Sequence, residues 1–403
     1  MPQRLESTAW EPVHIFELWR GEWGLTREAE FRADPWYIVS GKEVVDSGFG
    51  KPPKDFFSKT LPPGVVVPGF VNAHSHIELS CMLGKVPVGS HLTQMGTIIQ
   101  AQRGSLTKQQ IRQAAVTAIR HAENFGTFFF CDICNSVDFI RFLRDLPLFN
   151  GNRYLELLGF SSPSDQARIA SAQELLDIDS TFYPTVHSIY GSSPLQMRFV
   201  REKARHTSVS IHLLESAAEI DFQDDKGQIV EFLEQIGQRV RHHEMQGRSA
   251  IDYLYAMGML SFKKLLMVHL SAARVEDIDK LNEYVPHAAW VLCHRSNKHL
   301  VIERTNWEKF KNSPLKMLIG TDSLATNTDL SVLHELKAIL QEDKFSERDL
   351  LRAATWDAYE YLEFRNNTIP HFIYPNARPN IASLGSVARV EVLGVQNNHP
   401  ETR

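Results

Sequence analysis

Cysteine is scarce in this sequence, with 4 residues among 403, and two of these, Cys131 and Cys134, form a Cys-x-x-Cys pair. A zinc ribbon needs a second such pair, and a redox motif expects a helix N-terminus, whereas this pair closes a Phe-rich, strand-like run. We therefore expect buried thiols that hold no metal, in a protein of a reducing compartment.

Long apolar runs and blocks of like charge are also missing from the sequence. No run approaches the roughly 18 uncharged residues of a membrane span, and the opening MPQRLESTAWEPVH has no apolar stretch of the secretory kind. Lys plus Arg number 43 against 48 Asp plus Glu, for a formal net charge of -5. No basic block could follow a phosphate backbone. We expect a cytoplasmic protein with neither a nucleic-acid nor a membrane partner.

Short apolar runs of strand length alternate with helix-like, charged segments, which is the pattern of βα units. Eight such runs cover residues 64–74, 126–133, 153–160, 181–187, 209–215, 264–270, 288–294 and 315–322. Segments 107–126, 221–240 and 273–285 favour helices, the first of them with Thr107 as a cap and Gly126 as a stop. The span of about 250 residues is usual for a (β/α)₈ barrel, so we predict an α/β fold with one TIM barrel over 64–364.

The two ends of the chain differ from this middle part. Residues 1–63 and 365–403 contain the strand-like pieces HIFELW, WYIVSG and VARVEVLG without a helical repeat. Segment 51–64 is rich in proline, which disfavours both helix interiors and central strands, and is expected to lead into the barrel. We predict that the two ends pair into one small β domain.

Histidines gather at the ends of the predicted strands, where a barrel of this kind carries its catalytic groups. These residues are His74 and His76 for the first strand, His187 for the fourth, His212 in the fifth, His269 for the sixth, His294 for the seventh and Asp322 for the eighth. Packing alone does not require so many polar groups at one rim. The pattern indicates a reactive centre.

The spacing indicates a metal site. Side chains two apart on an extended segment point to the same face, so His74 and His76 can reach one ion, and His212 and Asp322 can approach it from other strands. Three imidazoles and one carboxylate suit one divalent metal, for which zinc is the first choice and iron and manganese are alternatives.

Five segments resemble the signatures of the amidohydrolase superfamily, in its branch of chlorohydrolases and nucleobase or nucleoside deaminases. These segments are PGFVNAHSH (68–76), SIHLLES (210–216), VHLSAARVEDI (268–278), LCHRSN (292–297) and LIGTDSLATN (318–327). The resemblance implies that the four residues named above bind the metal, that Glu215 shuttles a proton and that His269 helps to hold the attacking water.

The chemistry of a deamination supports these roles. Asp322 can take the proton of a water that a divalent ion has acidified, while His269 holds the resulting nucleophile in line. Glu215, three residues beyond His212, is placed to protonate the ring nitrogen and the departing amine. We predict a hydrolase that acts on a carbon–nitrogen bond of an amino-heterocycle.

Two further residues have open interpretations. Glu78, two residues beyond His76, could accept hydrogen bonds from the hydroxyls of a sugar substrate or could form a structural salt bridge. His187 could contact the substrate or could be hydrogen-bonded at the barrel rim.

Other functions compete with this one. A binuclear enzyme that cleaves a cyclic amide typically carries a modified lysine at the end of strand four, where this sequence reads PTVHSIY with no lysine before Lys203. Chlorinated triazines, guanine, cytosine and thioether adenosines are alternative substrates for a mononuclear site. A non-catalytic scaffold is a third alternative, although such a protein should have lost ligands.

Within the branch, HSHIELS (74–80), RYLELLGF (153–160), residues 216–237 and SAIDYLYAMGML (249–260) look most like aminodeoxyfutalosine deaminases. That resemblance implies a small-molecule substrate, an adenine nucleoside of menaquinone synthesis. His294 stands where that group usually has a proline. A homodimer is compatible with the sequence.

Overall fold

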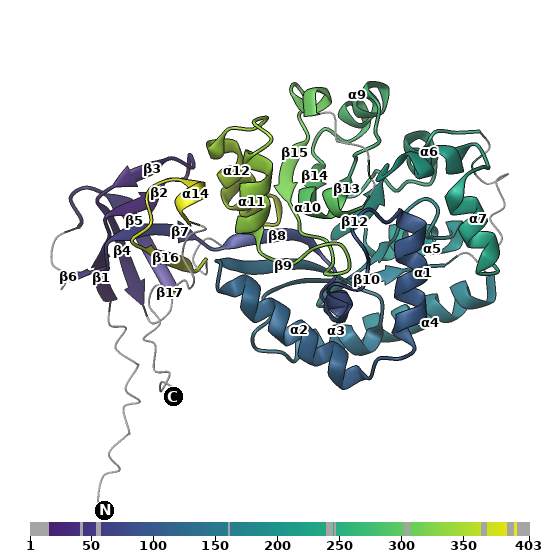
Figure 1. The fold of residues 1–403 in the computed structure, drawn as a ribbon, viewed down its shortest axis with the longest axis horizontal. Coiled ribbons are helices and arrows are strands. Elements are labelled where there is room, and N and C mark those ends of the chain that lie inside the picture. The colour runs from purple at the N-terminus through teal and green to yellow at the C-terminus, as the bar shows by residue number, and fades with distance from the viewer. Residues whose placement is uncertain are drawn as a thin grey trace, which may run out of the picture. The chain divides into compact units, whose positions relative to one another are not determined.

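In the computed structural model, the chain forms the elements drawn in Figure 1. The structure describes residues 16–40, 43–53, 58–159, 162–238, 245, 247–300, 302, 307–363, 369–384 and 391–392. These residues divide into two compact units. The smaller unit takes the described residues of 1–26, 30–68 and 365–403, and the larger takes those of 27–29 and 69–364.

The smaller unit consists of two sheets built from both ends of the chain. The first has the order β5-β4-β1-β6, with β1 Phe16–Arg20, β4 Pro35–Ser40, β5 Glu43–Phe49 and β6 Ser58–Thr60. The second has the order β17-β16-β7-β2-β3, with β2 Trp23–Leu25, β3 Phe31–Ala33, β7 Gly64–Pro68, β16 His371–Pro375 and β17 Glu391–Val392. Strand β16 runs antiparallel to β7, so the small β domain expected from the two ends is confirmed. The remainder of the strand-like piece at 387–394 lies outside the described residues.

The larger unit is the predicted (β/α)₈ barrel. Its strands are β8 Phe70–Ser75, β9 Thr127–Cys134, β10 Gly151–Leu157, β11 Phe182–Val186, β12 Ser208–Leu213, β13 Lys264–His269, β14 Ala289–Leu292 and β15 Lys316–Ile319. They form two parallel groups, β8 to β11 and β12 to β15, each in chain order.

Two sets of backbone hydrogen bonds join these groups into a closed barrel. The His212 N–H donates to the His187 carbonyl at 2.9 Å, which connects β12 to the end of β11. The Thr321 and Asp322 N–H groups donate to the His74 carbonyl at 3.0 and 3.1 Å, which connects the end of β15 to β8. Closure therefore brings the first and last strand ends together.

The prediction of one continuous strand over residues 64–74 is wrong. The structure breaks it after Pro68, so that β7 pairs with β16 in the smaller unit and β8 pairs with β9 in the barrel. Val65, Val66, Val67 and Phe70 are all at most 1% exposed, so the apolar pattern continues across the break and does not reveal it. The Pro68-Gly69 pair is the only local feature of the sequence that indicates a break in the strand.

Helices surround the barrel strands, and the best predicted of them agrees closely with the sequence. Helix α2 spans Lys108–Glu123, and its cap Thr107 accepts a hydrogen bond from the Gln110 N–H. Gly126 follows with a φ of 81°, a conformation that suits glycine. The predicted helix 221–240 is instead two helices, α6 and α7, because Gly227 between them has a φ of 86°.

The other α-helices span between 4 and 17 residues. They are α1 Leu92–Arg103, α3 Val137–Arg144, α4 Ser162–Ile178, α5 Pro194–Lys203, α6 Ala217–Gln223, α7 Gln228–Gln235, α8 Ala250–Ala256, α9 Val275–Tyr284, α10 His294–His299, α11 Val332–Leu340, α12 Glu347–Ala354, α13 Trp356–Tyr361 and α14 Ile381–Leu384. Among the described residues, two 3₁₀ helices are also present, Ile77–Met82 and Trp307–Phe310. Within the described ranges, no helix is both long enough and apolar enough to cross a bilayer.

The smaller unit contains a buried histidine that should make folding sensitive to acid. The His371 ring lies 5.4 Å from the Tyr37 ring, its Nδ1 lies 3.1 Å from the Ile369 carbonyl, and burial lowers its pKa to about 4 from 6.5. Because the folded-state pKa is the lower one, this stability is present above pH 6.5 and is lost as the pH falls towards 4.

We expect the His371→Phe variant to lose less stability on acidification than the wild type. Urea denaturation at pH 7 and pH 4 should give a difference of about 3 kcal/mol between the two proteins in the pH dependence of the unfolding free energy. Equal pH dependence would show that His371 does not titrate on unfolding.

Candidate active site

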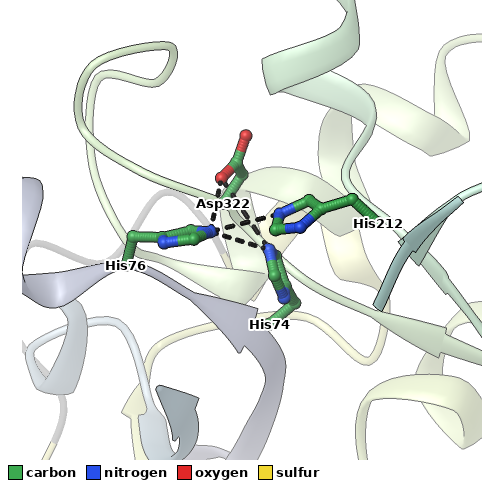
Figure 2. Close-up of side chains that lie close together, drawn as sticks. All are labelled: His74, His76, His212 and Asp322. Carbon is green, nitrogen blue, oxygen red and sulfur yellow. Dashed lines mark hydrogen bonds and ion pairs between the residues drawn. The ribbon is translucent and has the colours of Figure 1, made fainter. Parts of the chain in front are cut away.

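The four predicted metal ligands converge at one point of the barrel (Figure 2). His74 lies on β8, His76 follows it directly, His212 lies on β12, and Asp322 follows β15. Nε2 of His76 is 3.2 Å from Nε2 of His74, 3.3 Å from Nε2 of His212 and 3.6 Å from Oδ1 of Asp322. All four ligand atoms lie within 4.8 Å of one another.

The protonation of these side chains fits a cation. Nδ1 of His212 lies 3.1 Å from the His187 carbonyl, which accepts its proton and leaves Nε2 with a lone pair. Burial lowers the pKa of His76 to about 3 and that of His74 well below its usual value, so both imidazoles are neutral at pH 7. Three imidazole nitrogens and a carboxylate oxygen would repel one another without a positive charge between them. The donor set therefore fits a divalent ion.

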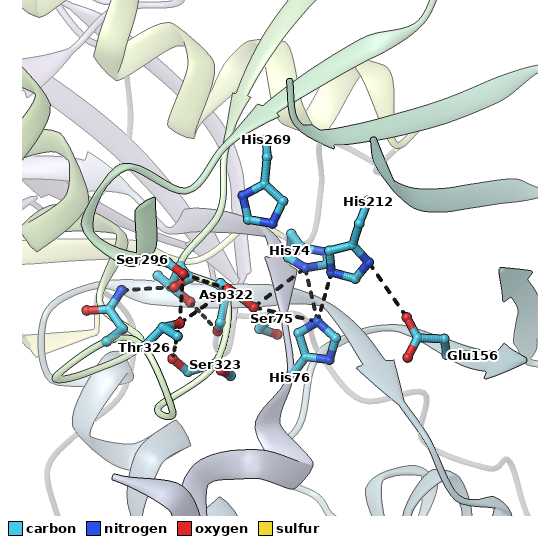
Figure 3. A network of polar contacts seen from close by, with 12 residues as sticks. His74, Ser75, His76, Glu156, His212, His269, Ser296, Asp322, Ser323 and Thr326 are labelled. Carbon is cyan, nitrogen blue, oxygen red and sulfur yellow. Dashed lines mark hydrogen bonds and ion pairs between the residues drawn. The ribbon is translucent and has the colours of Figure 1, made fainter. Parts of the chain in front are cut away.

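Neighbouring hydroxyls orient the carboxylate. Oδ2 of Asp322 accepts hydrogen bonds from the Ser296 hydroxyl at 2.7 Å and from the Thr326 hydroxyl at 3.3 Å (Figure 3). Oδ1 remains directed at the imidazoles, 3.6 Å from His76 and 3.9 Å from His74. Such outer contacts fix the direction of a metal ligand.

The backbone around the site adopts unfavourable conformations. Leu214, His269, Leu270 and Asp322 have φ values of 48°, 75°, 51° and 60°, in the left-handed region that non-glycine residues rarely adopt. Each costs on the order of 1–3 kcal/mol, and such residues cluster at functional sites. The strain therefore marks the ends of β12, β13 and β15 as a functional region.

The sequence reasoning missed Asp132, a buried residue on β9. Its Oδ1 accepts hydrogen bonds from the Ser75 hydroxyl at 2.9 Å and from the Ile77 N–H at 2.7 Å, on either side of His76. Asp132 thus positions the backbone that carries this ligand. Asp132 lies near the end of the second barrel strand, and this position could have identified it as a site residue from the sequence.

His269 lies beside the four-residue cluster rather than within it. Its ring centroid is 5.6 Å from that of His212. Nδ1 lies 2.9 Å from the Asn297 amide oxygen, which accepts its proton, and Nε2 lies 3.6 Å from Oε1 of Glu215. His269 thus directs an unprotonated nitrogen towards Glu215.

Glu215 is held in the loop after β12. Its backbone N–H donates to Oε2 of Glu219 at 2.9 Å. Glu215 is 3% exposed, and burial raises the pKa of its carboxyl group to about 7. Both protonation states are therefore available near neutral pH, as a proton shuttle requires.

The structure favours the structural interpretation of Glu78. Its Oε2 accepts a hydrogen bond from the Asn135 N–H and its Oε1 one from the Ser136 hydroxyl, both at 2.8 Å. Arg103 lies 3.8 Å from the same carboxylate. Both oxygens are thus engaged at the start of α3, and Glu78 is not among the described residues that line the cavity beside the cluster.

His187 is both hydrogen-bonded at the barrel rim and exposed to the cavity, so it is compatible with both interpretations that the sequence left open. Its Nδ1 is hydrogen-bonded to the Ser188 hydroxyl at 2.8 Å, and its ring lies 4.7 Å from that of His212. It also lines the cavity.

A cavity of about 290 Å³ opens on the cluster. Polar side chains form its base, and the apolar faces of α1 and α7 form its walls. The walls include Leu92, Met95, Ile99, Ile229, Phe232, Leu233 and Ile236. Gly96 permits the two helices to approach, because a Cβ atom there would lie 3.1 Å from the Phe232 ring. The size and lining suit a small molecule with an apolar part.

Residues 65–368 match the model of the Amidohydrolase family. The chain belongs to this family. Members of this family depend on a metal, and the four-residue cluster could bind one. The comparison thus confirms the family that the sequence motifs indicate.

Similar proteins include several deaminases. The chain is 27% identical over 284 residues to an adenosine deaminase of Helicobacter pylori, with 68% of each chain covered. It is 24% identical over 327 residues to an aminodeoxyfutalosine deaminase of Nitratiruptor, with 76% of each covered. The solved H. pylori aminofutalosine deaminase in complex with methylthio-coformycin superposes with a TM-score of 0.77 at 21% identity, covering 93% of this chain and 97% of that one. At that identity the superposition supports the barrel fold alone.

The cluster should hold about one ion per chain, because its four donors converge on a single point. We expect His74→Ala and Asp322→Asn to lose the ion, as measured by inductively coupled plasma mass spectrometry after gel filtration. His287→Asn is the control, since the ring of His287 contacts the Phe262 carbonyl instead of the cluster. Full occupancy in either cluster variant would remove that residue from the ligand set.

A second variant separates ligands from neighbours. His269→Ala should keep the ion, because its Nε2 faces Glu215, and should lose turnover because that nitrogen no longer orients the nucleophile. Metal content and kcat, measured on the same preparation, show whether His269 is a ligand or a neighbour of the ligands. Loss of the ion together with activity would make His269 a ligand.

Proposed function

We propose that the protein is a metal-dependent deaminase of an adenine nucleoside, with aminodeoxyfutalosine as the first substrate to test. The observation that carries this proposal is the position of Glu215 beside His269, in the same cavity as the four-ligand cluster. This arrangement allows an acid–base group and a nucleophilic water to act on the same substrate.

The relatives support the reaction class. The predicted enzyme class, a hydrolase that acts on carbon–nitrogen bonds, is confirmed by the family and by relatives named as adenosine and aminodeoxyfutalosine deaminases. An adenine nucleoside is therefore the substrate class that both the sequence and the relatives favour.

We propose that His74, His76, His212 and Asp322 hold one zinc ion, because this donor set is typical of catalytic zinc, with iron and manganese as alternatives. When bound, a divalent ion lowers the pKa of water towards 7 and so provides a nucleophile at neutral pH.

The side chains of the chain itself then carry the protons. The carboxylate of Asp322 would accept the proton of the attacking water, and the His269 imidazole would hold that water in line. Glu215 would protonate the ring nitrogen as the water adds to the adjacent carbon, then take the remaining proton of the added hydroxyl as the carbonyl forms and deliver it to the departing amine. The first water proton, held by Asp322, would restore Glu215 for the next turnover. A carboxyl group with a pKa of about 7 can do both.

Cleavage of a cyclic amide by a binuclear site is the less favoured alternative. Such a site needs a residue that bridges two ions at the end of the fourth strand, where β11 is followed by His187 and Ser188. Of the described residues that line the cavity, none is a lysine.

A role in menaquinone synthesis would follow if aminodeoxyfutalosine is accepted. A cytoplasmic location and a homodimer stay predictions from the sequence.

The role of Glu215 can be tested with a conservative variant. Glu215→Gln should keep the fold and the metal but lose on the order of 10² to 10⁴ in kcat for ammonia release from an adenine nucleoside, as expected for a lost general acid–base. Glu276→Gln is the control, because Glu276 is an exposed carboxylate on α9 that does not line the cavity.

The outcome separates the reaction classes. Near wild-type deamination by Glu215→Gln would overturn the proposed mechanism. Cleavage of a cyclic amide, with no ammonia from a panel of aminated purines, pyrimidines and nucleosides, would move the protein to the rival hydrolase class.

A further inference from the structure

Glu156 is a buried carboxylate in the cavity for which the mechanism has no use. It lies near the end of β10, is 3% exposed, and lines the same cavity as Glu215 and His187. Buried carboxylates are rare unless they are paired, so its contacts indicate its role.

One of the two oxygens of Glu156 lacks a hydrogen-bond donor. Oε2 accepts a hydrogen bond from the Asn135 side-chain amide. Oε1 is buried and has no hydrogen-bond partner among the described residues. It lies 3.8 Å from Nδ1 of His212, but the proton of that nitrogen goes to the His187 carbonyl. An unpaired buried acceptor is costly, so a donor from outside the chain is expected.

The cationic side chains nearby do not fill this position. Arg103 lines the cavity, but its guanidinium donates to the Asn135 amide oxygen at 3.0 Å and lies 3.8 Å from Glu78. Arg168 also lines the cavity, and within the described part of the chain it makes no ion pair within 4.0 Å of Glu156. Oε1 therefore remains open to a ligand.

The position of Glu156 shows which part of a ligand it can meet. Glu156 faces the Nδ1 edge of the His212 ring, whereas the Nε2 edge faces the cluster (Figure 3). In the proposed mechanism the reacting carbon lies at the cluster, so a group that reaches Glu156 would belong to the non-reacting part of the substrate. A carboxylate accepts hydrogen bonds only, and the donors of an adenine nucleoside beyond its reacting amine are its sugar hydroxyls.

We propose that Glu156 is a specificity-determining residue that accepts a hydrogen bond from the 2′- or 3′-hydroxyl of the nucleoside ribose. The proposal rests on the proposed function. It also transfers to Glu156 the sugar-binding role considered for Glu78, whose two oxygens are already engaged by residues at the start of α3.

The test compares adenosine with 2′-deoxyadenosine and 3′-deoxyadenosine. The wild type should prefer adenosine over at least one deoxy analogue by about 10- to 100-fold in kcat/KM, the range for a hydrogen bond to a charged group. Glu156→Gln should lose most of this preference and keep its metal. The Gln carbonyl oxygen would take the bond from Asn135, which turns the amide NH₂, a donor, towards the cavity.

Glu78→Gln is the matched control. It changes a neighbouring buried carboxylate that does not line the cavity, so any loss should be the same for all three nucleosides. A wild type that treats the three nucleosides alike overturns the proposal, even if Glu156→Gln fails to fold. An equal loss on all three in a folded, metal-loaded Glu156→Gln also overturns it.

Failure of the proposed function would look different. If the wild type releases ammonia from none of the nucleosides, deamination of this substrate class is wrong, and the Kd values of the same three compounds, from calorimetry, decide the role of Glu156. Weaker binding of a deoxy analogue supports the hydroxyl contact. Equal Kd values, or no binding, overturn it.

Discussion

Closure of the barrel is the constraint on which the site depends. The His74 carbonyl accepts the N–H groups of Thr321 and Asp322, and the His187 carbonyl accepts that of His212. The bonds that join the two strand groups thus involve the ligand residues themselves. A parallel barrel brings all its carboxyl strand ends to one rim, so side chains far apart in the chain meet there without dedicated loops.

A second layer of polar contacts gives each reactive atom its direction. Ser296 and Asn297, both on α10, bind Asp322 and His269 respectively. Asp132 accepts hydrogen bonds from the Ser75 hydroxyl and the Ile77 N–H, on either side of His76. One short helix therefore orients two groups of different function. His294, which begins this helix, lies 3.3 Å from Glu342 through its Nε2. Burial lowers the pKa of His294 to about 4, so this contact joins a neutral imidazole to a carboxylate at pH 7.

The barrel and the cluster could be predicted from the sequence because strand periodicity and the type of residue at each strand end are local properties. The break after Pro68 could not, since apolar residues fill the cores of both units across it. The roles of Glu78 and Glu156 were not accessible either. Both residues lie near a strand end, and only the hydrogen bonds of their oxygens distinguish them. Asn135 and Ser136 occupy both oxygens of Glu78, whereas Asn135 occupies only one oxygen of Glu156.

The pairing of β7 with β16 has a consequence for biosynthesis. Val66 is paired with Ile373, so the strand that leads into the His74 strand gains this neighbour only after residue 373 has been made. Contacts that join residues about 300 positions apart form slowly, because a long loop must close before they contribute. The ribosome-bound chain would therefore carry its histidines for much of translation before Asp322 can join them, and metal capture in the native geometry would be a late event.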